Sequence, residues 1–353
     1  MSKIKLFYGL ITALLLVSMT AWTACSVFKE EKITLKVIYA GSLIVPFEEI
    51  KKQFESKHPK VKVEMEGHGS IQVIRHVTDL KKQADVLAVA DYSLIPDLMY
   101  EDYADWLIRF ATNQIVIAYT GRSKYAGEIN SNNWYEILSR PEVKFGFSNP
   151  YTDACGYRTF MVMQLAEIYY QEPKLVDRLI SANFTPSITT QKDNDHYTVF
   201  IPEAIKPKET KIHMRGGSIQ VLSLLETGII DYAFEYKSVA LQHGLKFIEL
   251  PPRINLGSPD QENFYNRVKV KFGFSRFTRV SNEQTGKTIF YALTIPKNSS
   301  HKASAEEYVR FVIGPEGKKI LQACKHPVIP PQTDNPEKCP AQFVSSGERP
   351  EGK

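Results

Sequence analysis

The chain lacks the features of a nucleic-acid-binding or membrane-embedded protein. It has no block of basic residues and no array of basic and aromatic residues, and a net charge of +5 is slight for 353 residues. Its longest apolar run, residues 6–22, is short for a membrane-spanning helix, which needs ~20 apolar residues. We therefore expect no nucleic-acid partner and no membrane span.

Sequence motifs of catalysis are also missing. There is no G-x-S-x-G motif and no P-loop, and the eight histidines show no H-x-x-x-H or similar metal spacing. Cys155 stands at an expected helix start, which lowers the pKa of a thiol, but it has no evident base partner. The sequence therefore indicates neither an enzyme nor an organic cofactor.

Cysteine is scarce, with four residues in the whole chain. Cys324 and Cys339 lie near the C-terminus and could form a disulfide outside the cell, or stay as two thiols. Cys25 ends a segment that reads as an export signal, because Lys3 and Lys5 precede the apolar run and small residues close it. Its setting resembles a lipobox, which implies a lipid anchor on Cys25 at the extracytoplasmic face of the cell membrane; ordinary signal cleavage is the alternative.

The residues after position 25 are too many for the usual single core of ~250 residues, so we expect two lobes. Strand, helix and strand patterns at 33–40, 46–58 and 61–65 predict an α/β fold with parallel strands and covering helices. Residues 181–213 show no clean periodicity and are interpreted as an irregular insertion. The organisation expected is a signal at 1–25, a discontinuous lobe 1 at 32–119 plus 288–332, lobe 2 at 120–287, and a mobile polar tail at 333–353.

A near-repeat of five residues is the most informative feature of the chain. The sequence Gly-Ser-Ile-Gln-Val occurs at 69–73 and again at 217–221, each time opening an apolar-striped segment. Each segment leads to a short strand that ends in an acid and a tyrosine, Asp91-Tyr92 and Glu235-Tyr236. A Gly-Ser step before a helix leaves backbone N–H groups free and adds a hydroxyl, which suits a small anion. Two such devices predict two similar lobes that face one ligand.

Four loops each follow an expected strand and precede an expected helix, and ligands of open α/β sheets bind at such loops. Converging helix N-termini would favour an anion through their partial positive charges. Taken singly, each residue also has an ordinary role: Ser70, Ser218 and Asp153 as helix caps, and Glu235 as a surface acid. The loops are Gly41-Ser42, Gly69-Ser70, Asp153–Gly156 and Gly216–Ser218.

Four motifs, Gly41-Ser42-Leu43, Gly67–Ser70, Ser148–Arg158 and Phe234–Lys237, together resemble the archaeal tungstate/molybdate-binding proteins of ABC transporters. The resemblance covers about residues 33–330. It implies a two-lobed periplasmic-binding-protein-like fold of class II, with mixed sheets flanked by helices and a hinge of two crossing strands. It also implies a monomer that delivers the anion to a membrane permease and its ATPase.

The resemblance implies that Asp153 and Glu235 coordinate the tungsten or molybdenum of the bound anion. Two carboxylates beside a dianion would otherwise repel it by several kcal/mol in a partly dry cleft. Sulfate cannot expand its coordination shell, so the two acids would select against it. We expect the two carboxylates to come from opposite halves of the molecule. The full set of implied ligand residues is Gly41, Ser42, Ser70, Asp153, Ala154, Cys155, Glu235 and Tyr236.

Two other functions stay open on the sequence alone. One is a binding protein for sulfate, phosphate or a chelated metal. The other is an exported enzyme on the same fold, with Asp153 or Cys155 as its catalyst.

Overall fold

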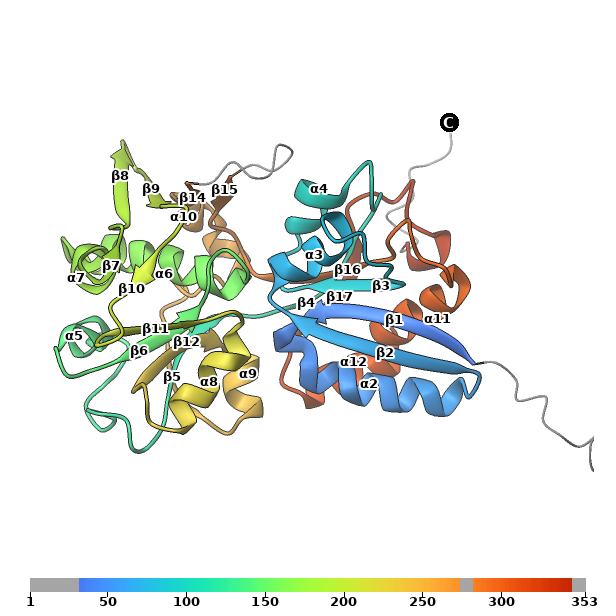
Figure 1. Ribbon diagram of the computed structural model, residues 1–353, viewed down its shortest axis with the longest axis horizontal. Coiled ribbons are helices and arrows are strands. Elements are labelled where there is room, and N and C mark those ends of the chain that lie inside the picture. The colour runs from blue at the N-terminus through green and yellow to red at the C-terminus, as the bar shows by residue number, and fades with distance from the viewer. Residues whose placement is uncertain (1–31, 274–281, 345–353) are drawn as a thin grey trace, which may run out of the picture.

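The computed structural model describes residues 32–273 and 282–344. The expected export signal, with Cys25, lies outside the described residues, as do the last positions of the expected tail. The described chain forms two lobes that lie side by side (Figure 1). Within these residues, no helix has the length and apolar character needed to cross a membrane.

Lobe 1 is built on a six-stranded mixed sheet in the order β17-β4-β16-β3-β1-β2. β1 pairs in parallel with β2 and β3, whereas the other neighbours pair antiparallel. The strands are β1 (Ile33–Ala40), β2 (Val61–His68), β3 (Val86–Val89), β4 (Ile108–Thr112), β16 (Phe290–Thr294) and β17 (Val328–Thr333). The helices are α2 (Ile44–Lys57), α3 (Ser70–Thr78), α4 (Leu94–Met99), α11 (Lys302–Ile313) and α12 (Pro315–Ala323), with the 3-10 turns η1 (Gly41–Leu43) and η4 (Ala341–Phe343).

Helices cover both faces of this sheet, so its central strands are buried on both sides. Successive residues of β1 point to opposite faces. Val37 therefore joins the core that contains Phe47 and Phe54 of α2. Ile38 joins the separate core that contains Val73 of α3. This double burial explains why β3 and the second half of β1 are continuous apolar runs.

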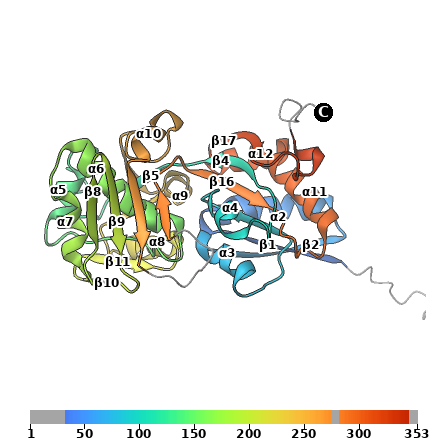
Figure 2. The same ribbon diagram turned by 90° about the horizontal axis from the view of Figure 1, so that it is seen from above.

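Lobe 2 has a five-stranded mixed sheet in the order β11-β6-β12-β5-β13 and a four-stranded sheet in the order β15-β14-β9-β8. The smaller sheet lies along the top of this lobe in Figure 1 and faces the viewer in Figure 2. The main-sheet strands are β5 (Ile115–Tyr119), β6 (Phe145–Ser148), β11 (Ile212–Arg215), β12 (Tyr232–Tyr236) and β13 (Lys246–Glu249). The other strands are β7 (Phe184–Thr185), β8 (Thr189–Asp193), β9 (His196–Ile201), β10 (Lys206–Pro207), β14 (Val268–Phe272) and β15 (Glu283–Thr285). The helices are α5 (Trp134–Ser139), α6 (Ala154–Tyr170), α7 (Leu175–Leu179), α8 (Ser218–Glu226), α9 (Lys237–Gln242) and α10 (Glu262–Tyr265), with η2 (Ser181–Asn183) and η3 (Pro259–Gln261).

The repeated pentapeptide occupies equivalent positions in the two lobes. Each copy opens a nine-residue helix, α3 or α8, with a glycine as the residue before it. Each helix leads to a strand, β3 or β12, of the lobe's main sheet. In lobe 1 the spatial order is β3-β1-β2, and in lobe 2 it is β12-β6-β11. The two lobes therefore share the same arrangement around their central parallel strands.

Two segments of the chain cross between the lobes. One is residues 113–114 between β4 and β5, and the other is residues 286–289 between β15 and β16. Residues 255–256 of lobe 2 contact the chain next to both crossings. Asn255 O accepts a hydrogen bond from Ile115 N, and Leu256 O accepts one from Ile289 N, each at 2.9 Å. The crossings thus lie together and can act as one hinge.

The prediction of an irregular segment at 181–213 is wrong. These residues include β8 and β9, which pair with each other as a hairpin, and β9 also pairs in parallel with β14 far along the chain. All five residues of β8 are exposed, so the strand has no apolar alternation for sequence analysis to detect. Its structure comes from pairing with a neighbour rather than from its own pattern.

The tail that follows residue 333 is anchored to lobe 1 in its described part, which ends at Val344. Asp334 accepts hydrogen bonds from the Leu107 amide at 3.0 Å and from the Tyr100 hydroxyl. Phe343 is buried and its ring lies 6.0 Å from that of Trp106, centroid to centroid. The polar composition of the tail concealed these anchors. Cys324, at the end of α12, and Cys339, in the tail, do not form a disulfide with each other.

Replacing Phe343 by Ala should lower the free energy of unfolding by about 3 kcal/mol, because the substitution leaves a cavity against Trp106. Urea unfolding measures the loss. The exposed apolar residue Leu80 supplies the control, since Leu80→Ala should change stability by less than about 0.5 kcal/mol. Equal effects of the two substitutions would show that the tail does not contribute to the fold.

Candidate functional site

The four predicted loops meet where the two lobes touch. Gly69 of lobe 1 lies against the Thr152–Asp153 backbone of lobe 2, so a methyl group on Gly69 would come within 2.3 Å of the Thr152 carbonyl oxygen. Gly217 lies next to the Asp153 carboxylate and the Gly69 amide. A methyl group on Gly41 would touch Ile219 of α8, at 3.6 Å. Glycine is needed at Gly69 because the loops approach more closely than any side chain allows.

Several first-turn backbone amides of α3 and α8, which the repeat predicts to be free, already have an acceptor. The Ile71 and Gln72 amides of α3 both donate to the Thr152 carbonyl, each at 3.2 Å. The Ser218 amide of α8 donates to Asp153 Oδ2 at 2.8 Å. Oxygen atoms of one loop, residues 152–153, thus accept hydrogen bonds from the first turn of both helices. This loop links the equivalent helices of the two lobes.

Three hydroxyl groups at this junction keep a hydrogen atom to donate. Ser70 Oγ accepts from the Ala90 amide at 3.0 Å. Ser42 Oγ accepts from the Tyr291 hydroxyl at 2.9 Å. Tyr236 Oη accepts from Arg158 Nη1 at 2.8 Å. Each oxygen accepts one hydrogen bond and its O–H donates to none of the described residues, so the O–H is available to an acceptor such as an oxyanion.

Arg158 of α6 is a buried cation that joins the lobes. Its Nη1 donates to Ala90 O of lobe 1 at 2.8 Å, and its Nη2 lies 3.0 Å from Asp91 Oδ2. The Tyr157 hydroxyl donates to the same Asp91 oxygen at 2.5 Å. Burial alone would raise the pKa of Asp91, but Arg158 and its hydrogen bonds bring that pKa down to about 2. Asp91 is therefore ionised, and the positive charge of Arg158 neutralises it.

Asp153 and Glu235 are buried without a cation of their own. Asp153 precedes α6 and accepts from the Cys155 amide as well as from Ser218. Burial raises the pKa of Asp153, although these backbone hydrogen bonds oppose the rise. Burial raises the pKa of Glu235 to about 8; the Tyr236 amide opposes this, and the nearby Asp153 adds to it. The two acids are thus close enough to interact electrostatically.

Glu235 has one carboxyl oxygen that is buried and has no hydrogen-bond partner among the described residues. Its Oε1 accepts from the Tyr236 amide at 2.7 Å, whereas Oε2 has no such contact, although the Ser218 side chain is near enough to lower the pKa of Glu235. The hydroxyl of Ser148, also fully buried, lacks an ordinary hydrogen bond as well. A buried polar group without a partner costs about 1–3 kcal/mol, so these two groups are energetically unfavourable in the unliganded protein.

Both acids belong to lobe 2, which corrects the expectation that they come from opposite halves. Asp153 follows β6 and Glu235 is within β12, and these two strands are neighbours in one sheet. Lobe 1 supplies Gly41, Ser42 and Ser70 instead. At the junction, lobe 2 therefore contributes the two carboxylates and lobe 1 the serine hydroxyls.

The thiol of Cys155 is not activated. It is fully buried, and its Sγ lies 3.8 Å from the Phe234 carbonyl oxygen. Burial raises the pKa of the thiol, and the nearby Glu235 and Asp153 raise it further. The helix start of α6, which should lower this pKa, is outweighed. Ala154 is the first residue of α6, so its amide has no partner within the helix.

Sequence reasoning missed Asp91, Arg158 and Tyr291 as members of this junction. Asp91-Tyr92 was recognised as the counterpart of Glu235-Tyr236, and that likeness could have placed Asp91 near the ligand. Arg158 is the only one of the three with a full positive charge, and its helical position gave no sign that it is buried. Tyr291 comes from β16, near the second crossing.

Comparison with known proteins agrees with this architecture. The bacterial extracellular solute-binding protein family matches residues 35–323. An uncharacterized solute-binding protein of Methanococcus aeolicus is 44% identical over 300 residues, covering 85% of this chain and 83% of the relative. Another from Staphylothermus marinus is 38% identical over 330 residues and covers 92% of both chains.

Solved structures share the fold at low sequence identity. The periplasmic molybdate-binding protein of Azotobacter vinelandii has a TM-score of 0.56 and 17% identity, covering 83% of this chain and 98% of its own. The sulfate-binding protein of Mycobacterium tuberculosis has a TM-score of 0.56 and 14% identity, covering 84% and 88%. The two-lobed fold expected from the sequence is thereby confirmed. The chain belongs to the bacterial extracellular solute-binding protein family.

Proposed function

We propose that the protein captures tungstate or molybdate between its two lobes and delivers the anion to an ABC permease and its ATPase. The observation that carries this proposal is the pair of buried acids, Asp153 and Glu235, beside hydroxyl donors and without a cation. The structural neighbour from Azotobacter vinelandii is described as a molybdate-binding protein, but its 17% identity supports only the fold.

The donors and the acids suit different parts of such an anion. The O–H groups of Ser42, Ser70 and Tyr236, with the Ala154 amide, would donate to oxo groups. The Cys155 amide, which donates to Asp153 Oδ1, would join them by turning to the anion. Glu235 Oε2, which has no other partner, would bond the electron-poor metal centre, and Asp153 would add a second carboxylate oxygen. Hard, highly charged metal centres prefer oxygen ligands of this kind. Sulfur and phosphorus centres in sulfate and phosphate do not accept additional carboxylate ligands, so the same acids would repel them.

Closure of the lobes completes the site in this proposal. The hydroxyls come from both lobes, whereas the acids come from lobe 2 alone, so an open molecule would present only part of the ligand set. The Asp91–Arg158 ion pair holds the lobes together close to the site. We expect the closed protein, as a monomer at the extracytoplasmic face, to be the form that the permease recognises.

Glu235→Gln should abolish tungstate selectivity while keeping the shape of the side chain. Titration calorimetry should show tight binding of tungstate and molybdate, and weak or no binding of sulfate, to the unaltered protein. The variant should bind tungstate at least 100-fold more weakly, because an amide oxygen is a poorer ligand and carries no charge. Glu226→Gln, on an exposed side chain, is the control and should bind normally. Tight sulfate binding without a tungstate response would end the proposal.

Tungstate binding should release a proton and strengthen as the pH rises towards 8. Glu235 has a pKa raised to about 8, so the unliganded protein is mostly protonated there at pH 7. Coordination requires the ionised form, so affinity should rise by up to about tenfold per pH unit below pH 8 and level off above it. Calorimetry in buffers of different ionisation enthalpy counts the proton. A protonated Glu235 that donates a hydrogen bond to an oxo group would give the opposite slope.

Asp91→Asn should weaken lobe closure, because it leaves the buried Arg158 without its counter-ion, a change that costs about 3–5 kcal/mol. Small-angle X-ray scattering should report a larger radius of gyration for the unliganded variant, and tungstate affinity should fall at least tenfold. Asp79→Asn, which removes the exposed ion pair with Arg75, is the control. If scattering curves of both variants match the unaltered protein, the ion pair does not hold the lobes together.

A further inference from the structure

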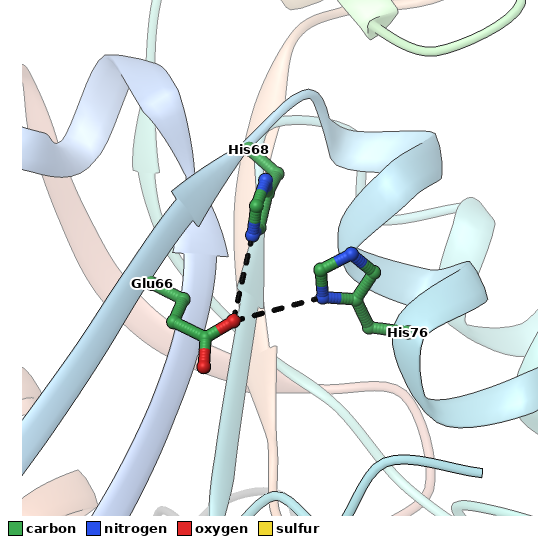
Figure 3. A group of neighbouring side chains, drawn as sticks. All are labelled: Glu66, His68 and His76. Atoms are coloured by element: carbon green, nitrogen blue, oxygen red, sulfur yellow. Dashed lines mark ion pairs between the residues drawn. The ribbon is translucent and has the colours of Figure 1, made fainter. Parts of the chain in front are cut away.

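We propose that Glu66, His68 and His76 form a binding site for a divalent transition-metal cation, typified by Zn²⁺, on the surface of lobe 1. One ligand atom from each residue lies within 4.8 Å of the others. Figure 3 shows the two imidazole rings and the carboxylate facing one another. This site is separate from the anion site, although the same turn of the chain contributes to both.

The β2–α3 turn assembles the three side chains. Glu66 and His68 stand two residues apart at the end of β2, and alternation along a strand puts them on the same face. His76 is on α3, which begins directly after the turn at Gly69. The histidines are too far apart in the sequence to form one of the short metal motifs, so the expectation that no histidine metal spacing exists overlooked them.

The distances approach those of a tetrahedral zinc site. Glu66 Oε2 lies 3.6 Å from His68 Nε2 and 3.9 Å from His76 Nδ1. Ligand atoms about 2.0–2.2 Å from Zn²⁺ at tetrahedral corners are about 3.3–3.6 Å apart. These two separations need to shorten by at most a few tenths of an ångström, and the ligand atoms of the two histidines lie within 4.8 Å of each other. Three protein ligands leave a fourth position for water.

The two ring nitrogens lack any other partner. His68 Nε2 and His76 Nδ1 are buried atoms without a hydrogen bond among the described residues. Their distances to Glu66 exceed those of a hydrogen bond. The two rings lie with their centroids 4.3 Å apart, so protonating both would place two positive charges side by side. Neutral imidazole nitrogens that face one carboxylate oxygen are a donor set suited to zinc.

Lys82 is the competing cation at this site. Its ammonium group donates to both oxygens of Glu66, at 2.6 and 2.5 Å. The Lys82 side chain is 40% exposed, so it can swing into solvent at small cost. Zn²⁺ would then replace the ammonium group at Oε2. Removing the lysine should therefore strengthen metal binding, which a merely structural cluster would not show.

Titration calorimetry with Zn²⁺ on the chelator-treated protein tests the proposal. We expect one saturable site, with an affinity at least tenfold lower in His76→Ala and in Glu66→Gln. Lys82→Met should raise the affinity several-fold and keeps all three ligands. Co²⁺ should give the intense visible bands of a tetrahedral site in the unaltered protein and lose them in His76→Ala.

His243→Ala is the matched control. His243 also faces a glutamate, Glu226 at 3.5 Å, but it belongs to no three-residue cluster in the described part of the chain. Its loss should leave zinc binding unchanged. Circular dichroism of metal-free His76→Ala verifies its folding, and zinc should raise the melting temperature of the unaltered protein but not of this variant. Absence of saturable Zn²⁺ binding, or equal affinity of Lys82→Met, His76→Ala and the unaltered protein, overturns the proposal.

Discussion

The junction between the lobes buries more acidic side chains than basic ones, and its other properties depend on this excess. Three acids, Asp91, Asp153 and Glu235, are buried there together with one guanidinium, that of Arg158. Arg158 is committed to Asp91 by an ion pair. The other two acids are desolvated and uncompensated, which raises their pKa values and makes ionisation costly. Under the proposed function, the electron-poor centre of the ligand supplies the missing positive charge, so binding and charge balance are the same event.

A hydrogen-bonded chain links this junction to the hinge. Asn113, at the first crossing, donates to Ser238 Oγ at 2.7 Å and to Tyr291 Oη at 3.1 Å, and Tyr291 donates to Ser42. His326 closes the chain next to Ser238, at 3.3 Å. Burial lowers the pKa of His326 to about 4, so the ring is neutral near pH 7 and the chain does not titrate there. Ser42 is thus oriented from the crossing itself, where any lobe rotation must begin.

Sequence analysis predicted the parts of the molecule whose structure depends on local patterns of apolar and polar residues. The pentapeptide repeat, the strands β1 and β3, and the helix α2 all have periodicities that depend on few neighbours. The exposed strand β8 and the tail around Phe343 depend on partners that are distant in the chain, so their own residues carried no signal. Arg158 shows the same limit at the site, because its burial follows from the contact of two lobes. The loops could be listed from the sequence, but the use of their amides by residues 152–153 could not.

The two proposed sites share the β2–α3 turn but use it differently. His68 faces Glu66 on the surface of lobe 1, whereas two residues later Ser70 is fully buried at the junction. Gly69 between them is fixed by its close contact with the Thr152 carbonyl of lobe 2. Cation binding at His68 and His76 would tie the end of β2 to α3 and so restrict the turn that carries Ser70. By thermodynamic reciprocity, any strengthening of anion binding by the cation must be matched by an equal strengthening of cation binding by the anion. The turn is short enough for such coupling to pass through the backbone alone.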